Sequence, residues 1–280
     1  MNAIPVFMYH HINHHVGDLV TLTPQDFENH LRVLRDRRIQ TFFLDELVQI
    51  LRGKGMPAQP SALLTFDDGH LDNWIYAFPL LKKYGMKATI FVITSWMGEG
   101  EKRTLWDPEG QGKEKLAEIP RHKEAKRRAA EGDLSVALNW EEARAMEASG
   151  LVDIQSHTHF HRDYFLGEEK FPRLDPEKQE TLMKDLAQSK TLIEGHLKKN
   201  CRYLSWPWGK YDAAALNVAR GLGFEAAVTT KKGVNHPGSE EMAIKRIVAK
   251  SGDASWFTKR MQIYSRRTIG KIYSRLAGRI

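Results

Sequence analysis

The stretch Ser61-Ala62-Leu63-Leu64-Thr65-Phe66-Asp67-Asp68-Gly69 decides the fold of this chain. Its apolar part lies between Pro60 and Gly69, which is typical of a buried strand. Two adjacent carboxylates at the end of such a strand repel each other and lose hydration on burial. A bound metal or a proton-transfer role compensates that cost, so the pair indicates a functional site.

A second polar cluster, Ser156-His157-Thr158-His159-Phe160-His161, follows another strand-like run at residues 151–155. One Asp with two His is the ligand set of a catalytic zinc that keeps an open position for water. One carboxylate of the first cluster and two imidazoles of the second supply this set if the fold brings the clusters together. The other carboxylate then stays free to act on the water.

Strand-like runs alternate with helical patterns along the chain, which predicts an α/β fold with a mainly parallel sheet. Helix starts are indicated by Thr23-Pro24-Gln25-Asp26, Asn139 and Asp175-Pro176, and helix ends by Gly85 and Gly150. The expected strands cover residues 4–9, 63–66, 88–93, 152–156, 202–205, 226–229 and 243–247.

Four reactive clusters lie just after the carboxyl ends of expected strands. They are His10, Asp67-Asp68, residues 157–161 and Trp206-Pro207-Trp208-Gly209. Enzymes built on βα-barrels assemble their sites at this end of the barrel. The pattern therefore predicts one site formed by four separate segments.

Length and composition set the frame for this fold. With 280 residues, 41% hydrophobic and 28% charged, the chain is expected to form one soluble barrel-like domain over residues 1–256. Cys201 is the only cysteine, so no intrachain disulfide is expected. The first residues lack the features of a secretory signal, and no apolar run is long enough to span a membrane. A cytoplasmic location is the resulting expectation.

An insertion of about residues 98–138 interrupts the alternation of strands and helices. It is dense in both charges and carries Trp106. Such a segment is typical of a solvated loop with one short helix. The alternative is a lid that shapes a substrate groove.

The motifs resemble those of the polysaccharide deacetylases, the carbohydrate esterases with a chitooligosaccharide-deacetylase homology domain. Residues 65–69 look like the first motif, His157-Thr158-His159-Phe160-His161 like the second, and Pro207-Trp208-Gly209 like the core of the third. The resemblance covers roughly residues 4–250. It implies a distorted (β/α)7-type barrel and a divalent metal, usually Zn²⁺, with Co²⁺ or Ni²⁺ as alternatives by ligand type.

The resemblance also implies residue roles. Asp67 corresponds to the catalytic base, and Asp68, His157 and His161 correspond to the metal ligands. The backbone N–H of Trp208 corresponds to an oxyanion donor. Pro207, Gly209 and the aromatic ring of Trp206 belong to the same groove-forming segment, and burial of at least one of the two indoles in the core is the alternative. From the residues alone, His159 is an alternative ligand that alternates with the outer two and favours the opposite side, and Asp72 is one candidate partner for a ligand imidazole.

Two departures from the family pattern stand out. Ser205 occupies the position where the third motif often carries an Arg that tethers the base, and Arg202 lies further off. The usual late Leu-x-x-His, which provides the general acid, is absent, because no His follows His236. The first strand instead carries Phe7-Met8-Tyr9-His10, as in the circularly rearranged branch of biofilm poly-N-acetylglucosamine deacetylases. His10 is the expected acid, with His11 and His236 as competitors.

The expected activity is metal-dependent removal of N-acetyl groups from an N-acetylhexosamine in a glycan or glycolipid. Two alternatives stay open from the sequence. One is a catalytically weak or silent glycan-binding barrel, since the tether Arg and the late His are missing. The other is a hydrolase of a different amide. Asp67 and Asp68 could also cap the following helix, and the histidines could form a surface cluster.

The segment 257–280 carries seven basic residues and no acidic one. Its charge of +7 equals the net charge of the whole chain. Such a segment either packs its apolar side on the barrel or lies on an anionic membrane surface. Nucleic-acid binding is not expected, because the rest of the chain is balanced in charge. Its apolar residues recur at helical intervals at Tyr264, Ile269, Ile272, Leu276 and Ile280.

Overall fold

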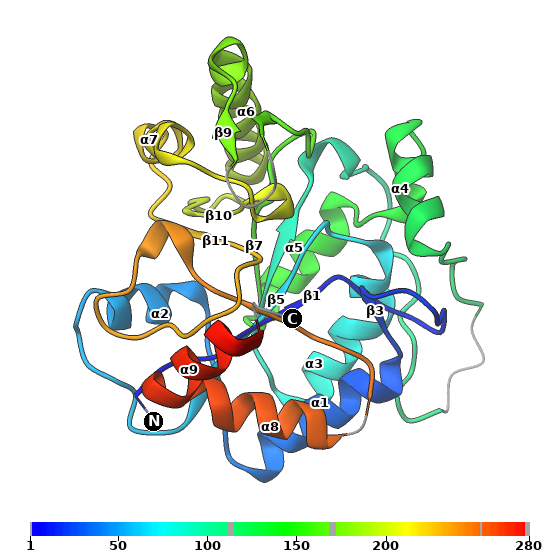
Figure 1. Ribbon diagram of the computed structural model, residues 1–280. Helices are drawn as coiled ribbons and strands as arrows, with labels where there is room; N and C mark the ends of the chain where they lie inside the picture. Colours follow the sequence, from blue (N-terminus) through cyan, green and yellow to red (C-terminus); the bar gives the residue numbers. More distant parts are fainter. Residues whose placement is uncertain (1, 111–114, 168–171, 253, 278–280) are drawn as a thin grey trace.

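A computed structural model describes residues 2–110, 115–167, 172–252 and 254–277 (Figure 1). Its central sheet contains only parallel strand pairs, in the order β11-β10-β7-β6-β5-β1-β12, and β4 pairs with β5 beside this path. The sheet strands are β1 (Val6–Tyr9), β4 (Gln40–Thr41), β5 (Ser61–Phe66), β6 (Ala88–Val92), β7 (Val152–Ser156), β10 (Tyr203–Ser205), β11 (Ala226–Val228) and β12 (Ile247–Val248). Two further small sheets pair β2 (His11–Ile12) with β3 (Thr21–Leu22) and β8 (Phe165–Leu166) with β9 (Arg173–Leu174).

The two edges of the seven-strand path meet. Val228 at the end of β11 forms a parallel bridge with Ile244, three residues before β12 begins. The Ile244 N–H donates to Ala227 O at 2.9 Å, and the Thr229 N–H donates to Ile244 O at 2.9 Å. These contacts curl the sheet into a distorted (β/α)7-type barrel, so the predicted fold is confirmed.

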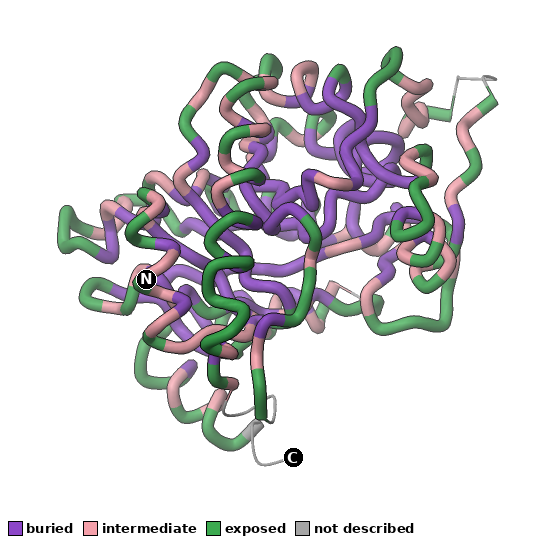
Figure 2. Tube along the Cα trace, turned by 90° about the horizontal axis from the view of Figure 1, so that it is seen from above, coloured by how far each residue is buried: buried purple, intermediate pink, exposed green. Residues whose placement is uncertain are grey.

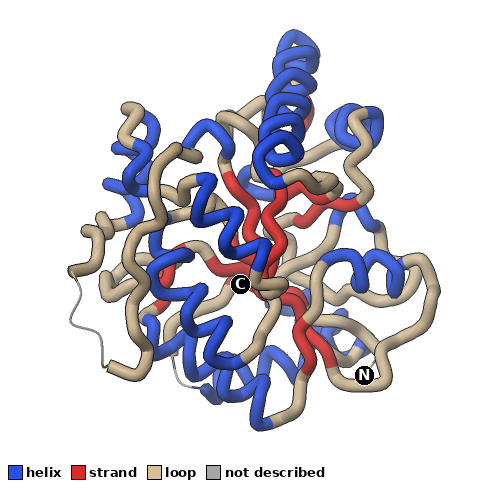
Figure 3. The backbone as a smooth tube through the Cα atoms, turned by 180° about the vertical axis from the view of Figure 1, so that it is seen from behind, coloured by secondary structure: helices blue, strands red, loops and turns tan. Residues whose placement is uncertain are grey.

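Helices surround the barrel, and the strands run through the middle (Figure 3). The α-helices are α1 (Pro24–Asp36), α2 (Leu44–Leu51), α3 (Phe78–Tyr84), α4 (His122–Ala130), α5 (Trp140–Ala148), α6 (Gln179–Leu197), α7 (Ala213–Gly221), α8 (Ala254–Tyr264) and α9 (Arg267–Ala277). Buried residues concentrate on the sheet and on the inner faces of the helices (Figure 2). None of the described helices is long and apolar enough to cross a membrane.

Local sequence signals start and end the helices as expected. Thr23 caps α1, since its hydroxyl accepts from the Asp26 N–H at 3.0 Å. Asn139 and Glu142 form a reciprocal capping box at α5. Gly85 ends α3 with a φ of 61°. These caps therefore confirm the helix boundaries predicted from the sequence.

The helix expected over residues 73–84 begins as a turn of π-helix, Asn73–Ala77, before α3. Pro79 has no N–H to donate to the carbonyl of Ile75, four residues earlier. That carbonyl instead accepts from the Trp106 N–H at 3.0 Å. The wider turn thus follows from the proline, and it places Asn73 where its amide donates to His10 O at 2.7 Å.

The last strand and the last helices depart from the expected boundaries. The strand expected at residues 243–247 starts later, as β12, because Glu241–Ala243 form a 3₁₀ turn. The expected domain boundary between residues 256 and 257 falls inside α8, which packs against α1. Residues 278–280, including Arg279 and Ile280 of the expected amphipathic pattern, lie outside the described residues.

Candidate active site

The two carboxylates of the first motif lie in a tight turn directly after β5. Asp67 and Asp68 are 2% and 1% exposed. Asp68 has a φ of 73°, which is unusual for a non-glycine residue, and Gly69 follows with a φ of 72°. A Cβ on Gly69 would lie 2.9 Å from Val92 Cγ1 on the neighbouring strand. The turn therefore needs this glycine, and it turns the two carboxylates toward different partners.

Asp68 faces the histidines of the second motif. Its Oδ1 lies 3.4 Å from His157 Nε2 and 3.8 Å from His161 Nε2, and the three candidate ligand atoms lie within 4.8 Å of one another. His161 N–H donates to Thr158 Oγ1 at 2.9 Å, and both residues have positive φ, 51° and 66°. The second motif is thus a tight loop that returns the outer imidazole toward the first.

These three residues fit a divalent metal. The Nδ1 of His157 lies 2.8 Å from Ser205 O, a carbonyl that can only accept, so Nδ1 carries the proton and Nε2 keeps a free lone pair. Asp68 stays ionised: although burial opposes its charge, Lys126 and the imidazoles of His157 and His70 hold its pKa well below the ordinary value. One carboxylate and two imidazoles are a donor set suited to zinc.

The alternative ligand, His159, points elsewhere. Its Nδ1 lies 2.9 Å from Thr94 Oγ1, and its backbone N–H donates to Asp185 at 2.7 Å. Asp72, the candidate partner for a ligand imidazole, accepts from Asn13 at 2.6 Å and lies 2.7 Å from His11 Nδ1. The partner of His157 is the Ser205 carbonyl described above.

Asp67 is tethered, contrary to the expectation from the third motif. Arg246 donates from Nη1 to Oδ1 and from Nη2 to Oδ2 of Asp67, both at 2.7 Å. Its side chain is fully buried, and its Nε donates to Thr229 O at 2.9 Å. Ser205, at the position of the missing Arg, completes the group: it donates to Asp67 at 3.2 Å and accepts from Arg246 at 3.1 Å.

This tether decides the charge of Asp67. Burial alone would raise the pKa of the carboxyl, but the adjacent guanidinium of Arg246 outweighs burial and lowers the pKa to about 2. Asp67 is therefore an ionised carboxylate whose two oxygens are both held by Arg246. A pair of basic residues between apolar ones, Ile244-Lys245-Arg246-Ile247-Val248, was the available sequence signal.

His10 lies directly after β1 at the same end of the barrel. The charges of Asp68 and Asp67 favour the protonated form of its imidazole and raise its pKa. Burial nevertheless dominates and lowers the pKa of His10 below 6.5. Its Nδ1 is buried and has no hydrogen-bond partner among the described residues. Of the two competitors, His11 is held by Asp72, and His236 makes local contacts with Pro237 and Ser239.

The insertion brings a helix, α4, to this site. From α4, Lys126 Nζ reaches within 3.2 Å of Asp68 Oδ2, and His122 Nδ1 lies 3.1 Å from His11 Nε2. His70 lies 3.2 Å from the same Asp68 oxygen. His70, His122 and Lys126 were not among the site residues predicted from the sequence.

His11, His70 and His122 also lie close enough together to suggest a metal group, with candidate atoms within 4.8 Å. The rings of His11 and His70, however, stack 3.7 Å apart at an interplanar angle of 19°. Ring-nitrogen lone pairs lie in the ring plane, so those of two nearly parallel stacked rings do not converge on one ion. Asp68, His157 and His161 are the better metal-binding group.

The third motif separates its two tryptophans. Trp208 has a φ of 53°, is 44% exposed, and its ring lies 4.4 Å from that of His161. Trp206 is 1% exposed, so its ring belongs to the core and not, as expected, to the groove. The 3₁₀ turn spans Pro207–Gly209 and so includes Trp208. A Cβ on Gly209 would lie 2.2 Å from Thr230 Oγ1. The turn presents one indole, that of Trp208, beside the metal-ligand group.

Fold and site together define a barrel hydrolase of the metal-dependent kind. The polysaccharide deacetylase family matches residues 54–227, more than half of the chain, so the protein belongs to this family. Its members are carbohydrate deacetylases and are generally metal-dependent, as the sequence predicts. The four segments that are distant in sequence therefore form the candidate site of a deacetylase-family barrel.

Individual relatives agree with this assignment. YxkH of Bacillus subtilis (strain 168), named as a polysaccharide deacetylase, is 28% identical over 249 residues, which are 89% of this chain and 72% of that protein. The poly-beta-1,6-N-acetyl-D-glucosamine N-deacetylase of Staphylococcus aureus (strain MRSA252) is 24% identical over 81% of this chain and 67% of that protein.

Solved structures share the fold. Deacetylase PplD of Streptococcus pyogenes, solved with acetate, has a TM-score of 0.72 at 22% identity and covers 92% of this chain and 98% of its own. IcaB of Ammonifex degensii has a TM-score of 0.70 at 22% identity and covers 93% of this chain and 96% of its own.

Proposed function

We propose that the protein removes acetyl from N-acetylhexosamine units of a glycan or lipid-linked saccharide, with zinc bound by Asp68, His157 and His161. The observation that carries the proposal is the separation of the two adjacent carboxylates. Asp68 faces two imidazoles, while Asp67 is held by Arg246 and stays unligated. A divalent metal in this donor set supplies Lewis acidity, which lowers the pKa of water and polarises a carbonyl.

Asp67 is the proton acceptor in this proposal. Arg246 keeps the carboxylate ionised and fixes both of its oxygens, so it is oriented before water arrives. Proton removal from the attacking water by a positioned base contributes about 10²- to 10⁴-fold to the rate. The carboxyl must return the proton after each turnover, which its low pKa favours.

His10 delivers a proton to the departing amine nitrogen. Because burial lowers the pKa of its imidazole, His10 starts the cycle neutral, and the proton that water gives up to Asp67 passes to His10 and from His10 to the amine nitrogen. The backbone N–H of Trp208 hydrogen-bonds the oxygen that gains negative charge, a contact worth about 3 to 4 kcal/mol in known oxyanion holes. The exposed indole of Trp208 offers a face for a sugar ring.

The silent-barrel alternative loses one of its two supports. It was based on the missing tether Arg and the missing late His, and Arg246 supplies the tether from the position directly before β12. The named activity of the staphylococcal relative points to β-1,6-linked N-acetylglucosamine as the first substrate to try. The predicted cytoplasmic location stays a prediction.

Acetate release tests the proposal. Protein loaded with Zn²⁺ is incubated with a panel of N-acetylated oligosaccharides that includes β-1,6-linked N-acetylglucosamine. We expect Asp67→Asn to lose about 10²- to 10⁴-fold in acetate release while elemental analysis finds the same zinc content. Asp36→Asn, at an exposed site on α1, is the matched control and keeps full activity.

Two outcomes would contradict the proposal. Unchanged acetate release by the Asp67→Asn variant would remove the base from the mechanism. Glycan binding without acetate release across the whole panel, by wild-type protein with zinc bound, would establish the silent barrel instead.

A further inference from the structure

The last two helices divide the apolar residues of the basic segment between two surfaces. In α8, Phe257, Met261 and Tyr264 are buried. In α9, the large apolar residues point the other way: Ile269 is 44% exposed, Ile272 55% and Leu276 58%. These three follow helical spacing, so they form a continuous stripe on the outer face of α9. We call them the α9 stripe.

A glycine contact fixes the orientation of α9. A Cβ on Gly270 would lie 2.3 Å from Val234 Cγ1 and 3.1 Å from Ile263 O, so only glycine permits this close approach. On the same inner side, the Tyr273 ring packs against Tyr264 at 6.0 Å, and the Arg260 guanidinium lies 4.9 Å above it. Because the inner face is occupied, the α9 stripe cannot turn toward the barrel without breaking these contacts.

Beneath α9 lies a pocket of about 340 Å³ that is lined by cations. Lys271 and Arg275 come from the helix, and Lys232 and Lys245 from the segment before β12. Among the described residues, no ion pair with an acidic side chain involves any of the four. We call these residues the basic pocket.

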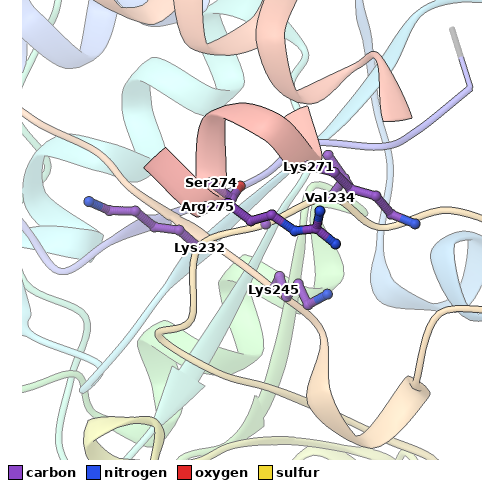
Figure 4. A pocket seen from close by; sticks show the side chains of 7 residues that line it. Lys232, Val234, Lys245, Lys271, Ser274 and Arg275 are labelled. Carbon is purple, nitrogen blue, oxygen red and sulfur yellow. The ribbon is translucent and has the colours of Figure 1, made fainter. Parts of the chain in front are cut away.

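The cations of the basic pocket are spread out. Arg275 extends over the segment that carries Lys245, whereas Lys232 and Lys271 reach to opposite sides (Figure 4). Burial and the charges of Arg267, Lys245 and Arg275 lower the pKa of Lys271. Side chains that do not point at one atom suit several phosphates of an extended surface better than one small anion.

We infer that the α9 stripe and the basic pocket dock the protein on an anionic membrane surface, with lipid phosphates in the pocket and the stripe among the acyl chains. Charge complementarity identifies the occupant, because no acidic residue is present from residue 257 onward. An apolar stripe bordered by cations matches an amphipathic helix in a membrane interface. Nucleic acid would use the cations but would leave the stripe in water. This inference is independent of the deacetylase proposal.

Vesicle binding tests the inference with the full-length chain. Flotation with phosphatidylcholine vesicles is compared with flotation on vesicles containing phosphatidylglycerol, at low and physiological salt. We expect binding only to the anionic vesicles, weakened by salt. Lys271→Gln with Arg275→Gln should reduce the partition coefficient about 25-fold, since each cation near such a surface contributes about fivefold. Ile272→Ser should reduce it at both salt concentrations.

Matched controls come from α6. Lys184→Gln and Met183→Ser remove an exposed cation and an exposed apolar side chain far along the sequence from α9. Both should bind vesicles like wild type, and circular dichroism of every variant should show the wild-type melting transition. Equal losses in the control variants would overturn the inference.

Other occupants give distinct results, and each would also overturn it. Failure of the wild-type protein to float with anionic vesicles would show that the α9 stripe and the basic pocket do not bind a membrane. Binding to a DNA duplex that depends on Lys271 and Arg275 but not on Ile272 would assign the pocket to nucleic acid. A dimer that dissociates in the Ile272→Ser variant would assign the stripe to a second copy of the chain.

Discussion

The mouth of the barrel, where the candidate active site lies, and the basic pocket under α9 both contain several cations. They differ in whether those cations are paired with acidic side chains. At the mouth, Arg246 is fully buried and both of its terminal nitrogens meet Asp67, and Lys126 lies against Asp68. In the basic pocket, four cations line one cavity without an acidic partner among the described residues. Charge that is paired inside the fold holds a site in shape, whereas charge left unpaired at the surface favours a partner from outside.

Replacing one cation in each region is the strongest test of this difference. Arg246→Met leaves the Asp67 carboxylate buried and unpaired, so we expect the free energy of unfolding to fall by about 3 to 5 kcal/mol. Arg275→Met in the basic pocket should change it by less than about 0.5 kcal/mol. Urea denaturation monitored by tryptophan fluorescence measures both values.

Arg246→Lys is the control for the first variant, because it keeps the charge but loses the two-pronged contact. Its loss of stability should be smaller than that of Arg246→Met. Comparable losses for Arg246→Met and Arg275→Met would show that pairing does not distinguish the two regions.

The pH dependence of stability examines α8, the helix that precedes α9 and packs on α1. The His30 ring stacks on Phe257 of α8 at 4.3 Å, and Tyr9 OH lies 3.1 Å from its Nδ1. Burial lowers the pKa of His30 from 6.5 to about 3. As pH falls, the unfolded chain binds this proton first, so stability is lost from about pH 6.5 and stops falling near pH 3.

At pH 5 the expected loss from His30 is about 2 kcal/mol relative to neutral pH. His30→Asn cannot titrate there and keeps an acceptor for Tyr9, so its stability should fall less steeply between pH 6.5 and 5. Thermal melts of both proteins across this range measure the difference. Parallel curves for the two proteins would mean that His30 is charged in the folded state.

Metal affinity tests a smaller effect at the mouth. Lys126 Nζ lies 3.2 Å from Asp68 Oδ2, so its charge competes with a metal for the same carboxylate. The side chain is one-third exposed, which limits the effect to about 1 kcal/mol, or about fivefold. Lys126→Gln should therefore bind Zn²⁺ about fivefold more tightly, as measured by competition with a chelating dye.

Lys123→Gln changes an exposed lysine of the same helix and should leave the zinc affinity unchanged. Weaker zinc binding by Lys126→Gln would contradict the competition and would mean that Lys126 holds the metal-ligand group in place.

The sequence predicted the barrel because each of its signals is local. Apolar runs, helix caps and the glycine after α3 each determine the conformation of only a few neighbouring residues, and the structure confirms these predictions. Three parts of the site were also predictable, since Asp68, His157 and His161 each follow a strand and parallel strands end at one side of a barrel.

The remaining parts of the site depend on tertiary placement. Arg246 reaches Asp67 only because β12 closes the barrel beside β1, and chain order does not show which strands become neighbours. The charges of α4 indicate a solvated helix, and its position over Asp68 is set by the rest of the fold. Trp206 and Trp208 look alike in sequence, but the positive φ of Trp208 turns only that ring outward.

The smallest predicted effect concerns the α9 stripe. Ile272 is 55% exposed, so little apolar surface leaves water when the chain folds around it. Ile272→Ser should therefore change the free energy of unfolding by less than about 0.5 kcal/mol. Phe257→Leu in α8, where the side chain is fully buried, should cost about 1 kcal/mol. Denaturant melts measure both variants. A loss above 1 kcal/mol for Ile272→Ser would mean that the α9 stripe stabilises the folded chain itself. The contrast between the barrel mouth, whose charges are paired within the fold, and α9, whose apolar residues face outward, would then no longer hold.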